Sequence, residues 1–233
     1  MKAFLLAAGH GERLRPITDT IPKCMVPIRG EPLLSIWLHL CKRIGIEEVL
    51  INVHAHAATV SEFLQQNASD VRVRVVAESQ LLGSAGTLRA NRDWVLSDDC
   101  FWVFYADVLH CVDLGSMMQM HRQHTPTATL GVYEVPDPTR CGIVTTDKGG
   151  IIREFVEKPR HPSSNLAFSG LMIATPALLD VIPESSPVDI GFHVLPQLGG
   201  RMLAYRIHDY LIDIGTMENY ERAQVTWPGF AGR

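Results

Sequence analysis

The sequence lacks the features that define several large classes of protein. Basic residues do not outnumber acidic ones, and the net charge of −4 gives no positive surface for non-specific nucleic-acid binding. No apolar run approaches the roughly 20 residues that cross a membrane. The 46% hydrophobic content excludes a disordered chain, and the 14 prolines and 18 glycines exclude a coiled coil.

The cysteines and the N-terminus indicate a compartment. The 5 cysteines are widely spaced and include no C-x-x-C pair, which favours reduced thiols over a disulfide or zinc framework. The apolar stretch that ends at Ala8 is broken by Gly9–Arg13, too early and with too much charge for a signal peptide. We therefore expect a cytoplasmic protein that binds neither nucleic acid nor membrane.

Strands and helices alternate along the first half of the chain, which is typical of parallel βαβ units covered on both faces. The first predicted strand runs into glycines, and the first helix carries apolar residues at helical spacing. The predicted strands are Lys2–Ala8, Glu48–Val53, Val71–Val76 and Phe101–Tyr105, and the predicted helices are Leu33–Ile44, Ala57–Gln66 and Thr87–Leu96.

The second half is richer in strands. The turn Asp147–Gly150 predicts a hairpin between two of them. Predicted strands are Ala128–Val135, Gly142–Thr146, Ile151–Val156 and Ala167–Ala174, and predicted helices are Asp189–Leu198 and Glu218–Gln224. With no Pro- or Ser-rich linker between the halves, we expect one α/β domain over residues 1–233. Its predicted fold is a Rossmann-like three-layer sandwich with a mixed, mainly parallel central sheet.

The loop after the first strand carries the clearest chemical signal. Gly9 and Gly11 allow backbone N–H groups to approach phosphate oxygens. A dinucleotide fingerprint would need a third glycine where Leu14 stands, and the lysine and hydroxyl residue of a P-loop are absent. Arg13 and Lys23 add two cations beside the glycine turn, which favours a polyphosphate ligand over a plain solvated loop.

Further motifs follow this loop in a fixed order. The loop contributes Gly9, Gly11, Arg13, Leu14, Pro16, Thr18, Pro22, Lys23 and Pro27. The later motifs are Leu82–Gly86, Tyr105–Val108, Glu157–Pro159, Asn165, Gly170 and Asp213–Thr216. Together they resemble the signatures of the sugar-1-phosphate nucleotidyltransferases, or nucleotide-sugar pyrophosphorylases. The resemblance runs from Lys2 to about Ala223 and is closest to short mannose- and heptose-type 1-phosphate guanylyltransferases.

The resemblance implies a reaction and a set of roles. A sugar-1-phosphate oxygen attacks the α-phosphorus of a nucleoside triphosphate, and pyrophosphate leaves. Catalytic roles are implied for Arg13, Lys23 and Asp107, and Mg²⁺ binding for Asp107 and Asp213. Nucleotide binding is implied for Leu6, Ala7, Ala8, Gly9, Gly11 and Gly83, and sugar-phosphate binding for Glu157, Lys158, Asn165 and Gly170. The nucleotide-binding lobe is expected over about residues 1–110 and the sugar-phosphate lobe over about 111–233.

One departure and several alternatives remain open. Ala106 stands where the family has glycine before the metal-binding aspartate, and its methyl group is expected to crowd a substrate or to have no effect. The Leu82–Gly86 segment resembles that of the guanylyltransferases, which implies GTP as the favoured nucleotide. The identity of the sugar or cyclitol phosphate and the formation of a homodimer are left open. The alternatives are a uridylyltransferase for an amino-sugar-1-phosphate, a non-catalytic nucleotide-sensing subunit and, disfavoured by Leu14, a nicotinamide-dependent oxidoreductase.

Overall fold

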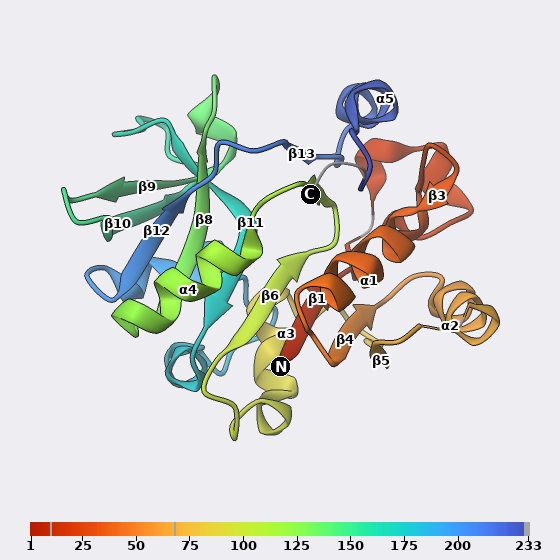
Figure 1. Ribbon diagram of the computed structural model, residues 1–233, viewed down its shortest axis with the longest axis horizontal. Coiled ribbons are helices and arrows are strands. Elements are labelled where there is room, and N and C mark those ends of the chain that lie inside the picture. Colours follow the sequence, from red (N-terminus) through yellow and green to blue (C-terminus); the bar gives the residue numbers. More distant parts are fainter. Residues whose placement is uncertain (10, 68, 231–233) are drawn as a thin grey trace. The chain divides into compact units, whose positions relative to one another are not determined.

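The computed structural model describes residues 1–9, 11–67 and 69–230, and they form two compact units (Figure 1). The first unit contains Met1–Leu81, Phe104–Val112 and the segment from Asp209 onward, and the second contains Leu82–Val103 and Asp113–His208. The sequence predicts a lobe boundary near residue 110. In the structure Leu82–Val103 belongs to the second unit and the segment from Asp209 onward to the first. The single nucleotidyltransferase domain stays a prediction.

The first unit is built on three parallel strands in the order β5-β4-β1. Ile51 on β4 lies beside Leu5 on β1 and Val75 on β5. Helix α1 buries one apolar face that includes Leu34 and Trp37, as its spacing predicts. The bounds are Lys2–Leu6 for β1, Leu33–Arg43 for α1, Glu48–Val53 for β4, Ala57–Gln66 for α2 and Arg72–Ala77 for β5.

Shorter elements of the first unit bring two distant segments together. Strand β7 (Val108–His110) pairs antiparallel with β13 (Leu211–Asp213). Asp213 therefore lies opposite Val108, the residue that follows Asp107. Helix α5 (Met217–Thr226) follows β13 directly. Strands β2 (Pro27–Ile28) and β3 (Glu31–Pro32) form a small ladder before α1, and single 3₁₀ turns occupy Glu12–Leu14, Ile17–Asp19 and Lys23–Met25.

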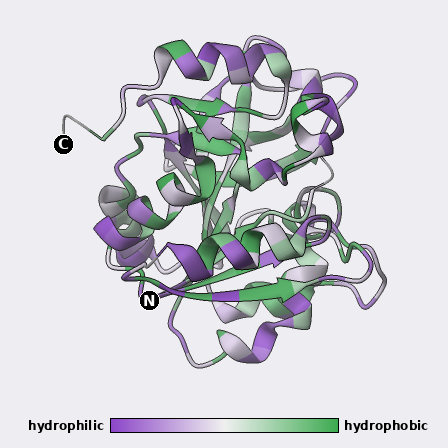
Figure 2. Ribbon diagram, turned by 90° about the vertical axis from the view of Figure 1, so that its right-hand side faces the viewer, coloured by the Kyte–Doolittle hydropathy of each residue, from purple (hydrophilic) through white to green (hydrophobic). Residues whose placement is uncertain are grey.

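The second unit is a five-stranded arrangement in the order β11-β8-β12-β10-β9. The β8–β12 pair is parallel, and the pairs β11–β8, β12–β10 and β10–β9 are antiparallel. The strands span Ala128–Glu134 (β8), Gly142–Thr146 (β9), Ile151–Glu157 (β10), Leu166–Ala174 (β11) and Met202–Arg206 (β12). Figure 2 shows the hydrophobic colour concentrated on strands and the hydrophilic colour on helices and loops.

The remaining elements of the second unit are α3 (Ser84–Ala90), α4 (Leu114–His124) and short helical turns. The turns cover Arg92–Trp94, Pro138–Arg140, Pro176–Val181, Ile190–Val194 and Leu195–Leu198. Strand β6 (Phe101–Tyr105) begins in the second unit and ends in the first, and Trp102 and Phe104 on it are fully buried, as expected for core residues.

The predicted α/β class with a mixed sheet is confirmed, and one helix bound is corrected. The β1–β4, β4–β5 and β8–β12 pairs of the mixed sheet are parallel, and its β11–β8, β12–β10 and β10–β9 pairs are antiparallel. The helix predicted at Thr87–Leu96 begins at Ser84 and ends at Ala90. It begins early because Ala85 and Gly86 donate their N–H groups to the Val188 carbonyl.

Over the described residues, no helix combines the length and the apolar character that a membrane span requires.

Candidate functional site

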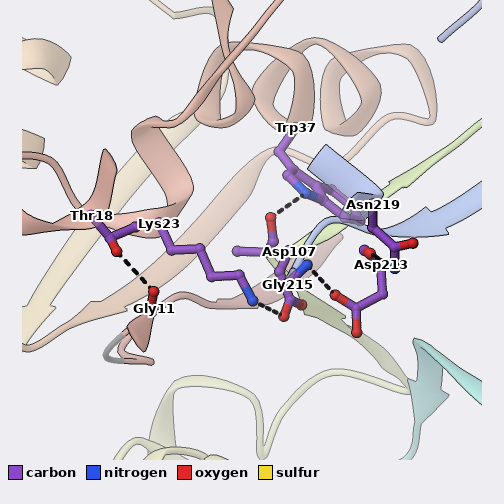
Figure 3. A network of polar contacts seen from close by, with 9 residues as sticks. Gly11, Thr18, Lys23, Trp37, Asp107, Asp213, Gly215 and Asn219 are labelled. Carbon is purple, nitrogen blue, oxygen red and sulfur yellow. Dashed lines mark hydrogen bonds and ion pairs between the residues drawn. The ribbon is translucent and has the colours of Figure 1, made fainter. Parts of the chain in front are cut away.

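The loop after β1 is held by a few specific hydrogen bonds. Gly11 has a φ of 67°, which favours glycine, and its carbonyl oxygen accepts hydrogen bonds of 2.8 Å from the Thr18 hydroxyl and from the Leu14 N–H. A Cβ atom on Gly11 would lie 2.9 Å from the Thr18 methyl carbon. The loop therefore closes tightly on Thr18 (Figure 3). Gly9 is exposed, with open space around its Cα.

Asn52 anchors the start of this loop. Its Oδ1 accepts a 2.8 Å hydrogen bond from the Ala7 N–H, and its Nδ2 donates to Glu78 Oε1 over 2.9 Å. Both polar side chains are buried. Sequence reasoning missed Asn52, although a polar residue inside the otherwise apolar strand Leu50–Val53 was a usable signal. The Ala7 N–H is thereby engaged by the protein itself.

Lys23, Asp107 and Asp213 converge in the first unit (Figure 3). The Lys23 ammonium lies 2.5 Å from Asp107 Oδ2, and the two side chains are 13% and 26% exposed. Asp213 Oδ1 accepts a 2.6 Å hydrogen bond from the Gly215 N–H. The Ile214 N–H donates to the Asp107 carbonyl over 2.9 Å, so backbone pairing holds both aspartates in place.

Gly215 marks how closely the charged groups approach one another. A Cβ atom there would lie 2.7 Å from Asp213 Oδ1, 2.9 Å from an Arg13 guanidinium nitrogen and 3.0 Å from Lys23 Nζ. Two cations and a carboxylate therefore approach the space that a side chain at position 215 would occupy. The structure thus brings together Arg13, Lys23 and Asp213, which are far apart in the sequence.

The electrostatics of this group follow from burial and from two neighbouring carboxylates. Burial raises the pKa of the Asp213 carboxyl, and the charge of Asp107 raises it further. Lys23, the Gly215 N–H and Arg13 lower the same pKa and offset part of this effect. A site of this kind gains from an additional cation, because a cation relieves the repulsion between the carboxylates.

The donor set suits a hard divalent cation that keeps other ligands. Asp107 and Asp213 supply carboxylate oxygens, which Mg²⁺ prefers. In the described ranges, no group of three or more His, Cys, Asp or Glu side chains is arranged to hold a metal ion. Two carboxylates completed by water and phosphate oxygens are an ordinary Mg²⁺ environment, so the residues fit that ion.

Ala106 is buried beneath this group. It is 2% exposed, its N–H donates to the Leu6 carbonyl over 3.0 Å, and its carbonyl accepts a 3.1 Å hydrogen bond from the Trp37 indole. The methyl group is therefore packed inside the first unit.

In the second unit, the turn at Gly83 packs directly on residue Val188. Gly83 has φ 79° and ψ 163°, a conformation that only glycine adopts readily. The Val188 carbonyl accepts hydrogen bonds from Ala85 and Gly86, and the Val188 N–H donates to the Leu82 carbonyl over 2.8 Å. A Cβ on Gly83 would overlap the Val188 backbone.

Gly83→Ala is therefore expected to destabilise the protein by about 3–5 kcal/mol, the sum of backbone strain and overpacking. Gly150→Ala is the matched control in the same unit, because Gly150 has φ 80° and its nearest neighbour would lie 3.8 Å from the new Cβ. Its expected cost is about 1–2 kcal/mol, from the left-handed backbone alone. Urea unfolding of both variants checks the difference, and equal midpoints would contradict the close packing on Val188.

Glu157 is the last residue of β10, and Lys158 follows it directly. Lys158 has a φ of 49°, its N–H donates to the Cys141 carbonyl over 2.9 Å, and its Nζ lies 3.9 Å from Glu157 Oε1. Burial raises the pKa of the Glu157 carboxyl, Lys158 lowers it and the charge of Asp189 raises it. The helix predicted over Asp189–Leu198 consists of two short helical turns, Ile190–Val194 and Leu195–Leu198, and Asp189 caps the first of them.

Of the other two predicted sugar-phosphate residues, Asn165 directly precedes β11 and Gly170 lies within it. The Asn165 carbonyl accepts a 3.0 Å hydrogen bond from the Val135 N–H, and Gly170 (φ 81°) lies where the β11–β8 register shifts. Among the contacts of the described residues, neither Asn165 nor Gly170 is bonded to Glu157 or Lys158.

Comparison with known proteins defines the class. The model of the Nucleotidyl transferase family matches residues 2–227, and the chain belongs to that family. It is 29% identical over 227 residues to mannose-1-phosphate guanylyltransferase 1 of Arabidopsis thaliana, covering 94% of this chain and 63% of that protein. It is 32% identical over 241 residues to the UTP–glucose-1-phosphate uridylyltransferase of Synechocystis, covering 96% and 62%. The chain thus spans less than two thirds of these relatives.

Solved structures show the same fold. The crystal structure of HddC from Yersinia pseudotuberculosis matches with a TM-score of 0.82 at 24% identity, covering 96% of this chain and 97% of that one. A UDP-glucose pyrophosphorylase complexed with UDP-glucose matches with a TM-score of 0.83 at 23% identity, covering 97% of both chains. These likenesses confirm the expected fold class.

Proposed function

We propose that this protein transfers a nucleotidyl group from a nucleoside triphosphate to a sugar-1-phosphate or cyclitol-1-phosphate, giving a nucleoside-diphosphate sugar and pyrophosphate. The observation that carries the proposal is the convergence of Arg13, Lys23, Asp107 and Asp213 behind the glycine turn after β1. Membership of the Nucleotidyl transferase family supports the reaction class.

The chemistry asks for neutralised charge and alignment rather than a protein nucleophile. An oxygen of the sugar phosphate forms a bond to the α-phosphorus, the bond between that phosphorus and its bridging oxygen breaks, and pyrophosphate leaves. In this proposal the N–H groups of Gly9 and Gly11 bind the triphosphate, and Leu6, Ala7 and Ala8 border the nucleotide. Arg13 and Lys23 stabilise the negative charge on the phosphates. Asp107 and Asp213 hold Mg²⁺, which neutralises phosphate charge when it is bound.

The remaining roles in this proposal are those that the family resemblance implies. Gly83 lets the backbone approach the base, and Lys158 binds the phosphate of the sugar phosphate. Glu157 accepts hydrogen bonds from sugar hydroxyl groups, and Asn165 and Gly170 border the sugar.

GTP is the favoured nucleotide. Several relatives are named mannose-1-phosphate guanylyltransferases, including proteins of Arabidopsis thaliana and Xenopus tropicalis, at 29% and 30% identity. The uridylyltransferase of Synechocystis, at 32% identity, makes UTP the second candidate.

The test is pyrophosphate release over a grid of substrates. GTP, UTP, dTTP, CTP and ATP are crossed with the 1-phosphates of mannose, glucose, N-acetylglucosamine, a heptose and a cyclitol, with Mg²⁺ or with EDTA. One strong, Mg²⁺-dependent combination with GTP is expected. A strong combination with UTP and an amino-sugar phosphate would replace guanylyl by uridylyl transfer, and nucleotide binding without any turnover would support a sensing subunit instead.

Glu157 makes the binding of the sugar phosphate depend on pH. Because burial raises its pKa, the carboxylate is protonated at a higher pH than an ordinary glutamate as the solution is acidified. The KM for the sugar phosphate is expected to rise by about tenfold as the pH falls through that pKa, since a hydrogen bond to a charged acceptor is lost.

Glu157→Gln separates this effect from titration of the substrate. The variant is expected to start from a high KM and to keep only the pH dependence of the sugar phosphate itself. Initial rates from about pH 4.5 to 8 measure both profiles, a range set by the ordinary glutamate and phosphate pKa values. Parallel profiles for the two proteins would remove Glu157 from the sugar site.

A further inference from the structure

An aromatic side chain lies exposed beside the predicted phosphate-binding lysine. Phe192 is 54% exposed, although phenylalanine is normally buried. The Lys158 Nζ lies 5.6 Å from the centroid of the Phe192 ring, within the range of a cation–π contact. Lys158 itself is 56% exposed, and its flexible stem has many rotamers in solution. Its other charged contact, to Glu157 Oε1, is long at 3.9 Å.

The backbone that carries this ring is held rigidly. Asp189 Oδ1 accepts hydrogen bonds from the N–H groups of Gly191 (2.8 Å) and Phe192 (3.1 Å). Asp189 Oδ2 accepts a 2.8 Å hydrogen bond from the Ser84 hydroxyl, whose oxygen accepts a 2.7 Å hydrogen bond from the Ile190 N–H. We call residues Asp189–Phe192 the Asp189 turn. The turn is therefore tied to the Ser84 end of α3.

The same turn also contacts the carboxylate next to Lys158. A Cβ atom on Gly191 would overlap the Glu157 carboxylate, so the absence of a side chain there lets this carboxylate lie against the backbone of the Asp189 turn. One rigid turn thus presents an aromatic face to the ammonium of Lys158 and a bare backbone to the carboxylate of Glu157.

We infer that Phe192 is a positioning residue, whose ring holds the Lys158 ammonium in the place where it binds the phosphate of the sugar-1-phosphate. This inference rests on the proposed function and adds a determinant of sugar-phosphate affinity to it. The Asp189 turn keeps the ring in place, and the ring limits the number of positions that the Lys158 side chain samples. Without the ring, the Lys158 side chain loses more conformational entropy when it binds the phosphate, and the affinity for the sugar phosphate is lower.

The test compares two substitutions of Phe192 with one control substitution at another exposed residue. Phe192→Leu keeps apolar bulk and removes the ring face, and it is expected to raise the KM for the sugar phosphate about threefold to fivefold. The kcat and the KM for the nucleoside triphosphate stay unchanged. Phe192→Tyr restores the KM because it keeps the ring, and Leu96→Ala is the matched control at another exposed apolar residue of the same unit, 45% exposed.

A second readout does not depend on turnover. In protein labelled with ¹³C-lysine, the ε-methylene signal of Lys158, assigned by its loss in Lys158→Arg, is expected to be shifted by the ring current. The shift disappears in Phe192→Leu and remains in Phe192→Tyr.

The outcomes separate the two proposals. If the wild type turns over but Phe192→Leu leaves the KM for the sugar phosphate unchanged, or raises the KM for the triphosphate equally, this inference is wrong and the proposed function stands. If the wild type releases no pyrophosphate with any pair of substrates, the proposed function fails, and this inference fails with it.

Discussion

Asp107→Asn is expected to lower kcat for nucleotidyl transfer by at least about a thousandfold, which corresponds to about 4 kcal/mol of transition-state stabilisation. The substitution keeps the shape of the side chain and removes one of the two carboxylate charges available to a divalent cation. It also removes the partner that lies 2.5 Å from the Lys23 ammonium. Steady-state rates at saturating substrates and increasing Mg²⁺ measure the effect.

The fold should survive this change. The Asp107 carbonyl, which accepts the Ile214 N–H, is part of the backbone and is untouched. Asp70→Asn is the matched control, because Asp70 forms an ion pair with Lys42 on the same unit and is exposed. It should leave kcat at the wild-type value. A near-normal rate for Asp107→Asn in Mg²⁺ would show that this carboxylate takes no part in the reaction.

Lys23→Met is the substitution with the second large expected effect, a loss of about a hundredfold to a thousandfold in kcat. A loss of this size is usual when one preorganised hydrogen-bond donor that stabilises negative charge is removed. The Lys23 side chain is 13% exposed, and its ammonium lies 2.5 Å from Asp107 Oδ2 and would lie 3.0 Å from a Cβ atom on Gly215. A methionine of similar length leaves the packing and removes the charge that stabilises the phosphates. Lys23→Arg should recover little, because a planar guanidinium does not fit the place of a compact ammonium.

Lys42→Met is the control for Lys23→Met. It removes an exposed ammonium that forms an ion pair with Asp70 in the first unit. The control therefore shows what the loss of an ion pair alone does to the rate. Single-turnover rates and thermal midpoints are measured for both variants. Equal rates for the two would contradict a role of Lys23 in the reaction.

Much of the fold could be predicted because local pattern and tertiary environment agree. Strands Glu48–Val53 and Phe101–Tyr105 and helix Ala57–Gln66 have the predicted bounds. The apolar residues of the two strands form short, continuous runs, and those of the helix follow helical spacing. Turn residues or polar residues mark the ends of all three elements. Strand β12 (Met202–Arg206) was missed, because its pairing with β8 depends on a partner about 70 residues away in the sequence.

The sequence pointed to the charged residues of the candidate site but not to the residues that hold its backbone in place. Motif order pointed to Lys23, Asp107 and Asp213, and the β7–β13 pairing brings the two aspartates together. Asn52 and Asp189 act through hydrogen bonds to backbone N–H groups that are distant in sequence or made within a turn. For Asn52 the sequence offered a polar residue inside an apolar strand, but neither residue carries a signal that names its hydrogen-bond partner, because any polar residue in a loop or strand could make such bonds.

The chain composition carries no signal of the two compact units. Leu82–Val103 joins the second unit and the segment from Asp209 returns to the first, although no linker composition marks either crossing. The β7–β13 ladder and helix α5 make that return, and their contacts are long-range.

The most direct test of the central claim is phosphorus NMR of one reaction of the wild-type protein with Mg²⁺, GTP and the sugar-1-phosphate that is most active in the grid. The account predicts that the phosphate monoester signal of the sugar phosphate is replaced by two coupled signals of a diphosphate ester, together with one equivalent of pyrophosphate. Release of orthophosphate, or of a nucleoside monophosphate with the sugar phosphate left intact, would contradict it.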